Sequence, residues 1–233
     1  WDAFQELLKQ TILETVNNIK IKQQINFSPK IKDIFENILE NSGEDKAFAA
    51  EMLILPTANF IAQQTETFDA HSIFLARLEL RRFVSNQLSN QMKQLIEESK
   101  SSESNDLGPE SAGRRALNNT CLSFLLEQQN DDTFDICLEK LRNSKNMTDE
   151  IAALTGLTNF DCPQRENAIS HFYEKWKNEE LVLDKWFMSQ ALSRLPNTLV
   201  NVKSLIDHKG FNFQNPNKVR SLIGAFCHGN HHL

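Results

Sequence analysis

The stretch "ELVLDKWFMSQALSRLPNTLVNVKSLIDHKGF", residues 180–211, decides the fold class. Its two halves, residues 180–194 and 195–208, repeat apolar residues at intervals of three and four, which is the period of an α-helix. Pro196 provides a start signal for the second half and Gly210 a stop after it. Because the joint between the halves is short, we expect the second helix to fold back against the first.

The same pattern continues on both sides of this pair. Further helices are predicted at residues 112–128, 133–143, 147–159, 162–178 and 215–226, with Thr148 as a start signal and Gly156 as a stop. Helices of about 10–16 residues with short joints form stacked antiparallel pairs. We therefore predict an all-α fold, a curved HEAT- or armadillo-like superhelical array. No signature of fixed period recurs, so the array is degenerate.

The first hundred residues contain longer helical patterns. One face of the first predicted helix collects Phe4, Leu7, Leu8, Ile12 and Val16. Pro29 opens a second helix, and Pro56 stops or kinks a third within residues 41–55. The longest predicted helix covers residues 69–99, with Asp69 as its cap.

A polar segment follows the longest predicted helix, and residues 99–112 are predicted as an exposed loop because they contain a Gly-Pro breaker. We interpret residues 1–233 as a single helical domain. The chain opens on Trp1, without a methionine, inside an amphipathic pattern, so we expect it to be part of a longer protein.

Composition excludes several classes of function. The formal charge of −6 argues against nucleic-acid binding, which requires a basic face. No apolar run approaches the roughly 18 residues that span a membrane, and residues 1–10 do not resemble a signal peptide. The four cysteines, Cys121, Cys137, Cys162 and Cys227, are far apart and form no C-x-x-C pair. Because Cys121 and Cys137 lie on apolar helical faces, buried, reduced thiols are predicted instead of a disulfide frame or a zinc site. These features favour a cytoplasmic protein without membrane contact.

Motifs for catalysis are absent from the sequence. There is no H-E-x-x-H, G-x-S-x-G, glycine-rich phosphate loop or EF-hand spacing, so we predict no catalytic residue. The metal-ligating residue types gather only near the end of the chain: Cys227, His228, His231 and His232. We interpret them as a terminal tail and predict no metal ligand. His71 and His171 each stand alone and are predicted to be core or boundary residues.

Two other clusters are interpreted as structural. Tyr173, Trp176 and Trp186 alternate with lysines, but neighbouring acids cancel the attraction for nucleic acid, so these aromatic residues are expected to pack between helices. Arg81 and Arg82 are predicted to lie on a solvated helix face.

The segment "FQNPNKVRSLIG", residues 213–224, has an unusual charge pattern. Asn215 and Pro216 suit an N-cap and a first helical position. Lys218 and Arg220 then place cations near the positive end of the helix dipole, where acidic residues are preferred. Two interpretations remain open: Arg220 pairs with an acid elsewhere in the fold, or it joins the backbone amides in binding a carboxylate or another anion.

This segment, with residues 175–211 before it, resembles the C-terminal helical domain of the bacterial aminopeptidase N family. Further similarity lies in "NMTDEIAALTGLTN", "RRALNNTCLSFL", "AFAAEMLILPT" and the initial "WDAFQELL". The resemblance spans nearly the whole chain in the family's order. Residues 11–32 and the polar segment 100–111 carry none of it.

The resemblance implies that the parent protein is a zinc-dependent peptidase that removes amino acids from the N-terminus of peptides. Its H-E-x-x-H zinc ligands and G-A-M-E-N loop belong to a preceding domain and are absent here, so we expect neither zinc nor turnover in this chain alone. The helical domain would cap the active site and enclose a cavity for peptide substrates. By the family's pattern Arg220 lines that cavity, and Asn215 is its neighbour in the same motif.

A second class of function stays open. The alternative is a stand-alone helical scaffold that binds a partner protein on its concave face. An upstream reading frame that contains H-E-x-x-H would select the peptidase domain, and its absence would select the scaffold.

Overall fold

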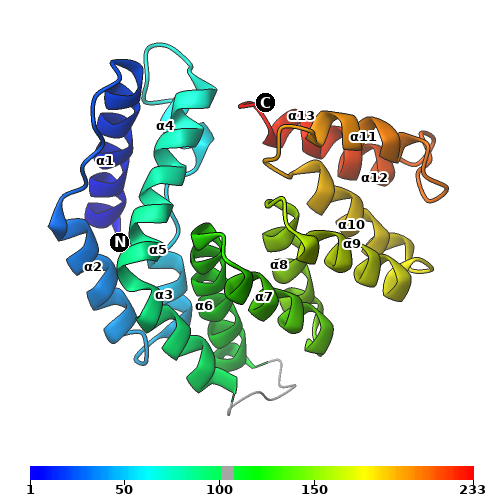
Figure 1. Ribbon diagram of the computed structural model, residues 1–233, viewed down its shortest axis with the longest axis horizontal. Helices are drawn as coiled ribbons and strands as arrows, with labels where there is room; N and C mark the ends of the chain where they lie inside the picture. The colour runs from blue at the N-terminus through cyan, green and yellow to red at the C-terminus, as the bar shows by residue number, and fades with distance from the viewer. Residues whose placement is uncertain (101–107) are drawn as a thin grey trace. The chain divides into compact units, whose positions relative to one another are not determined.

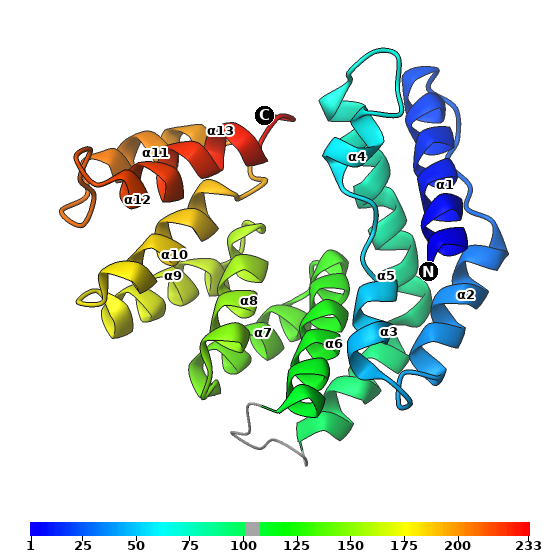
Figure 2. The same ribbon diagram turned by 180° about the vertical axis from the view of Figure 1, so that it is seen from behind.

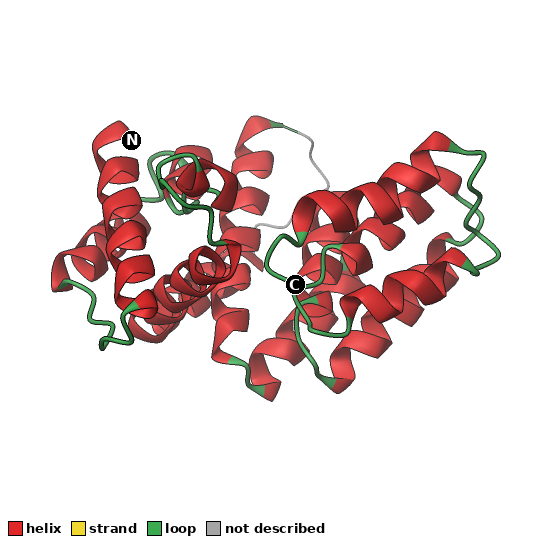
Figure 3. Ribbon diagram, turned by 90° about the horizontal axis from the view of Figure 1, so that it is seen from above, coloured by secondary structure: helices red, strands yellow, loops and turns green. Residues whose placement is uncertain are grey.

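The computed structural model describes residues 1–100 and 108–233 of the chain. Helices dominate these residues and no strand occurs among them (Figure 3), so the predicted all-α class is confirmed. The chain divides into two compact units, which are described separately. The first unit comprises Trp1–Gln128 with His232, and the second comprises Gln129–His231 with Leu233. The single domain over residues 1–233 stays a prediction.

Six α-helices and a 3₁₀ turn build the first unit. They are α1 (Asp2–Lys20), α2 (Pro29–Glu40), α3 (Lys46–Met52), α4 (Ala58–Ala62), α5 (Ala70–Lys100), α6 (Pro109–Leu125) and the turn Leu126–Gln128. Side-chain caps set several starts: Ser28 accepts from the N–H of Lys30, and Asp45 accepts from that of Phe48. Helices α5 and α6 run in opposite directions side by side (Figures 1 and 2).

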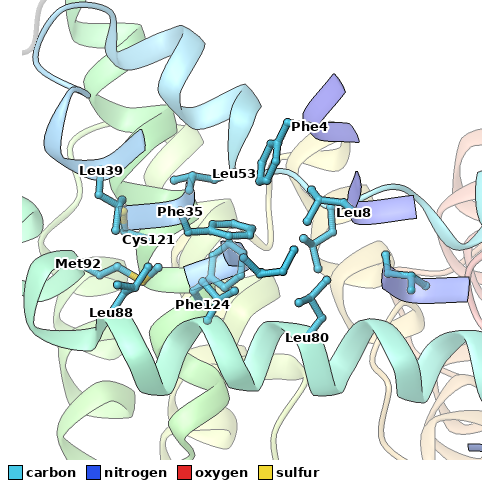
Figure 4. Packing of buried hydrophobic residues seen from close by; sticks show 14 of the residues in the cluster. Phe4, Leu8, Phe35, Leu39, Leu53, Leu80, Leu88, Met92, Cys121 and Phe124 are labelled. Atoms are coloured by element: carbon cyan, nitrogen blue, oxygen red, sulfur yellow. The ribbon is translucent and has the colours of Figure 1, made fainter. Parts of the chain in front are cut away.

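An aromatic core lies at the centre of the first unit (Figure 4). Phe35 of α2 is fully buried, and its ring makes edge contacts with Phe4 at 5.3 Å and Phe124 at 6.0 Å between centroids. Leu80, Leu88 and Met92 of α5 close the core from one side. Burial of each large apolar side chain contributes about 1.5–3 kcal/mol. Most of the predicted apolar face of α1 is in this core, although Leu7 is only partly buried.

Helices α3 and α6 approach each other through their backbones. A Cβ atom placed on Gly113 of α6 would lie 2.9 Å from the backbone nitrogen of Ala47 in α3. This distance is shorter than ordinary van der Waals contact, so the approach requires glycine.

Six further α-helices form the second unit. They are α7 (Asp131–Asn143), α8 (Met147–Thr158), α9 (Pro163–Trp176), α10 (Glu180–Ala191), α11 (Thr198–Ile206) and α12 (Pro216–Val219). A π-helical turn (Arg220–Gly224) then joins α12 to a short last helix, α13 (Ala225–Gly229). Consecutive helices from α7 to α11 contact one another through short joints. The series of consecutively packed helices that the sequence predicts on both sides of residues 180–211 is therefore present.

Hydrogen bonds hold both ends of α8, from the connection between α10 and α11 at one end and from the last turn of α9 at the other. At its C-terminal end the carbonyl of Thr158 accepts a 2.6 Å hydrogen bond from Ser193 Oγ, and the carbonyl of Asn159 accepts one of 3.3 Å from Arg194 Nε. At its start the buried carboxylate of Glu150 accepts from Lys175 Nζ at 2.6 Å and Trp176 Nε1 at 2.8 Å. The bonds to the two carbonyls satisfy backbone groups that the end of a helix leaves without partners, and the bonds to Glu150 compensate its buried carboxylate.

The predicted packing of the aromatic residues is confirmed. The ring of Tyr173 lies 5.1 Å from that of Trp186, and Trp176 lies 6.4 Å from Phe172. The indole N–H of Trp186 donates to the carbonyl of Ile169 at 3.0 Å, so this buried polar group is satisfied.

Several local predictions differ from the structure. Helix α8 passes through Gly156 instead of stopping there, and its cap is Asn146, not Thr148. Helix α4 was not predicted. The proposed loop at residues 99–112 is shorter, since α5 and α6 occupy its ends, and residues 101–107 lie outside the described residues.

The predicted environments of Arg81 and Cys227 are also wrong. Arg81 is not on a solvated face: its Nε lies 3.0 Å from Glu127 Oε1, and its guanidinium lies 4.6 Å from the centre of the Phe124 ring. Arg82, by contrast, forms a surface pair with Glu79. Cys121 and Cys137 are buried and free as predicted, whereas Cys227 is exposed.

Candidate functional site

The predicted start of the helix at Pro216 is confirmed. Asn215 has an extended backbone, and its Oδ1 accepts a 3.0 Å hydrogen bond from the N–H of Asn217. Pro216 occupies the first helical position. The side-chain oxygen of Asn215 therefore serves as the helix cap.

A π-helical turn interrupts the helix after α12. Within Arg220–Gly224 the spacing of the backbone hydrogen bonds widens from four residues to five. The N–H of Ala225 donates to the carbonyl of Arg220, five residues earlier. Ser221 and Leu222 of this turn are buried. Single π turns inside α-helices frequently occur at functional sites. No sequence pattern predicted this turn.

The two cations of this helix have different environments. Lys218 is buried, with Nζ 2.8 Å from Asp184 Oδ1 and 2.8 Å from the carbonyl oxygen of Glu180, both in α10. Arg220 is exposed, and it forms no ion pair with any residue that the structure describes. Internal pairing with an acid, which the sequence allowed for Arg220, thus belongs to Lys218.

The connection that leads into this helix is held by His208, which sequence reasoning missed. Nδ1 of His208 accepts a 3.0 Å hydrogen bond from the N–H of Gly210, so this nitrogen must be unprotonated. The ring packs edge-on against Tyr173 at 5.2 Å and Phe187 at 5.6 Å. Burial, together with the charge of Lys209, lowers the pKa of His208 from 6.5. An isolated histidine next to a Lys-Gly turn gave no distinctive signal.

No three His, Cys, Asp or Glu side chains in residues 1–100 and 108–233 are arranged to hold a metal ion. Of the two isolated histidines, His171 is partly buried as predicted, whereas His71 is exposed. None of the helices in the described ranges is both long and apolar enough to cross a membrane.

The fold and this segment define a helical-repeat domain that presents one exposed guanidinium beside a capped helix start. Over residues 1–233 the chain matches the family described as a domain of unknown function (DUF3458_C) with ARM repeats, and it belongs to that family. The helical-repeat character predicted from the sequence is therefore confirmed.

Relatives of this chain include aminopeptidases. It is 33% identical over 230 residues to aminopeptidase N of Escherichia coli, a match that covers 99% of this chain and 26% of that protein. Aminopeptidase N of Haemophilus influenzae is 29% identical over 233 residues, covering 100% and 26%. The chain thus spans about a quarter of these relatives, in their C-terminal part, and the resemblance to aminopeptidase N is confirmed.

A solved structure shares the fold. Aminopeptidase A of Legionella pneumophila, determined in complex with aspartic acid, is 27% identical to this chain with a TM-score of 0.83. The match covers 95% of this chain and 27% of that one.

Proposed function

We propose that this chain is the helical domain of a zinc-dependent aminopeptidase and that it encloses the cavity in which peptides are held. The observation that carries the proposal is the match to aminopeptidase N along 99% of the chain. A domain of stacked helices offers a broad surface for such a wall. Its partners would be the catalytic domain of the same polypeptide and peptide substrates, and its compartment the cytoplasm.

Zinc would be bound outside this chain. The described residues do not fit a zinc site, since no suitable group of ligands exists among them and the sequence lacks H-E-x-x-H. In the parent protein, bound zinc would supply Lewis-acid activation of the peptide carbonyl and of water. The role of this chain is to bind and orient the peptide.

Arg220 is the residue we assign to peptide binding. Its guanidinium is exposed and unpaired among the described residues, while the neighbouring cation is committed to Asp184. A planar guanidinium can bind a carboxylate through two parallel hydrogen bonds. Asn215 fixes the start of the helix that carries Arg220, and it is the second residue that we place at this site.

The test compares two substrate classes in the full-length enzyme. Arg220→Ala should impair hydrolysis of short peptides, which have a free carboxylate, more than hydrolysis of an alanyl anilide, which has none. Equal losses on both classes would remove the carboxylate-binding role.

The isolated chain provides a separate test of the division between domains. After dialysis it should retain no stoichiometric zinc and should not cleave an alanyl anilide. Bound zinc would point instead to the histidines near its end. An upstream reading frame without H-E-x-x-H would favour the stand-alone scaffold.

A further inference from the structure

Arg77 of α5, in the first unit, is a partly buried cation. Its Nε donates a 2.8 Å hydrogen bond to the carbonyl of Pro56, in the connection between α3 and α4. This bond fixes one edge of the guanidinium against the protein. The two terminal nitrogens, Nη1 and Nη2, form the other edge.

No carboxylate compensates this charge within the described residues, since Arg77 forms no ion pair with any of them. The charged group nearby is Arg81, a second cation, which is already paired with Glu127. Burial and the repulsion from Arg81 lower the pKa of Arg77 to about 10. The side chain therefore remains protonated at neutral pH.

Several other buried or partly buried cations among the described residues have acidic partners. Arg81 pairs with Glu127, Arg165 with Glu166 and Lys218 with Asp184. A partly buried cation without an acid is destabilising in the free protein. Natural sequences retain such local conflicts mainly where function requires them.

Exposed apolar side chains occur near Pro56, whose carbonyl accepts the bond from Arg77. Ile54 and Phe60 flank Pro56 along the chain, and their side chains are 47% and 44% exposed. Gln5 Nε2 donates to the carbonyl of Ile54 at 3.0 Å, so the connection is fixed from α1 as well as from α5. A fixed segment that carries exposed apolar groups and is bound by a cation suits a peptide better than an inorganic anion.

We propose that Arg77 binds a carboxylate of a polypeptide, supplied by a chain terminus or by an Asp or Glu side chain. With Nε engaged by Pro56, the Nη1–Nη2 edge is the one that can form paired hydrogen bonds with the two carboxylate oxygens. The ligand provides the negative charge that the first unit lacks at this position. This inference does not depend on Arg220, which belongs to the second unit.

The side-chain N–H signals of ¹⁵N-labelled protein test the proposal directly. Three blocked dipeptides are titrated: N-acetyl-Leu-Ala with a free terminal carboxylate, N-acetyl-Leu-Glu-amide with only a side-chain carboxylate, and N-acetyl-Leu-Ala-amide with neither. The first two arms distinguish the source of the carboxylate. Arg142, an exposed residue in the last turn of α7, is the internal control.

We expect at least one carboxylate peptide to shift the Arg77 signals saturably, with an affinity at least tenfold higher than at Arg142. The neutral amide should leave them unchanged. Arg77→Met should abolish binding measured by calorimetry, and Arg77→Lys should weaken it about tenfold because an ammonium cannot form the paired bonds. Equal, non-saturating shifts at Arg77 and Arg142, or no shift with either carboxylate, would overturn the proposal even if the variants fail to fold.

Discussion

Lys218 Nζ lies 2.8 Å from Asp184 Oδ1, and this contact separates the two cations of helix α12 and its π turn. The side chains of Lys218 and Asp184 are only 4% and 15% exposed, so each charge depends on the other for compensation. Arg220, two residues later, is exposed. One cation thus anchors the helix to α10, and the other remains at the surface.

Removal of the anchoring cation should destabilise the second unit. Lys218→Met leaves Asp184 buried without compensation, and we expect the free energy of unfolding to fall by about 3–5 kcal/mol in a urea titration. Lys203→Met, on the exposed side of α11, is the control and should change it by less than about 0.5 kcal/mol. Adding Asp184→Leu to Lys218→Met should recover most of the loss. Similar small effects of both single variants would contradict the anchoring role.

Loss of the exposed cation should affect peptide handling without affecting stability. In the full-length enzyme we expect Arg220→Ala to lower kcat/KM for short peptides about tenfold, the size of one lost charge-assisted hydrogen bond. The value for an alanyl anilide should change less than twofold. Arg142→Ala is the matched surface control. A urea midpoint that moves with Arg220→Ala would indicate a structural residue instead.

The approach of α3 to α6 predicts opposite outcomes for two glycines. Gly113→Ala places a methyl group 2.9 Å from the backbone of Ala47, and we expect about 1–3 kcal/mol of destabilisation despite the better helix propensity of alanine. Gly43→Ala meets no atom within 4 Å, and no described glycine has a positive φ. It should be neutral or stabilising by up to about 1 kcal/mol. Thermal melts of both variants compare them, and equal effects would disprove the close contact.

Stability should depend on pH through His208. Its pKa is lowered in the folded state, so below the unfolded value of 6.5 the unfolded chain binds more protons than the folded one. The contribution to stability is therefore complete above pH 6.5 and is lost as the pH falls from 6.5 through the folded pKa. Urea titrations between pH 7.5 and 5.5 measure this slope.

Two variants identify the group responsible for that slope. His208→Phe keeps an aromatic ring but cannot be protonated, so the slope should become shallower. His228→Gln alters an exposed histidine and should leave the slope as it is. A slope that survives in His208→Phe would assign the pH dependence to another group.

Local chemistry made much of the second unit predictable. Helices beginning at Pro163 and Pro216 follow from the fixed φ of proline and its missing N–H, which cost nothing at a first helical position. The same reasoning predicts the start of α2 at Pro29, which the structure confirms. The carboxylate of Asp69 caps α5 as expected. Gly156 misled the prediction because one glycine costs a helix only about 1 kcal/mol, and the buried Leu154 and Leu157 around it outweigh that cost.

The sequence by itself determined the helical class, the positions of most helices and the unusual pair of cations after Asn215, because periodicity and capping act between residues a few positions apart. Only the tertiary structure decided that Lys218 is buried and Arg220 exposed. Because residues two positions apart on a helix are rotated by about 200° around its axis, their side chains point to nearly opposite sides, about 160° apart. Which of them contacts Asp184 depends on how α10 packs against this helix. That packing joins segments far apart in the sequence, and a pattern over a few neighbouring residues cannot predict it.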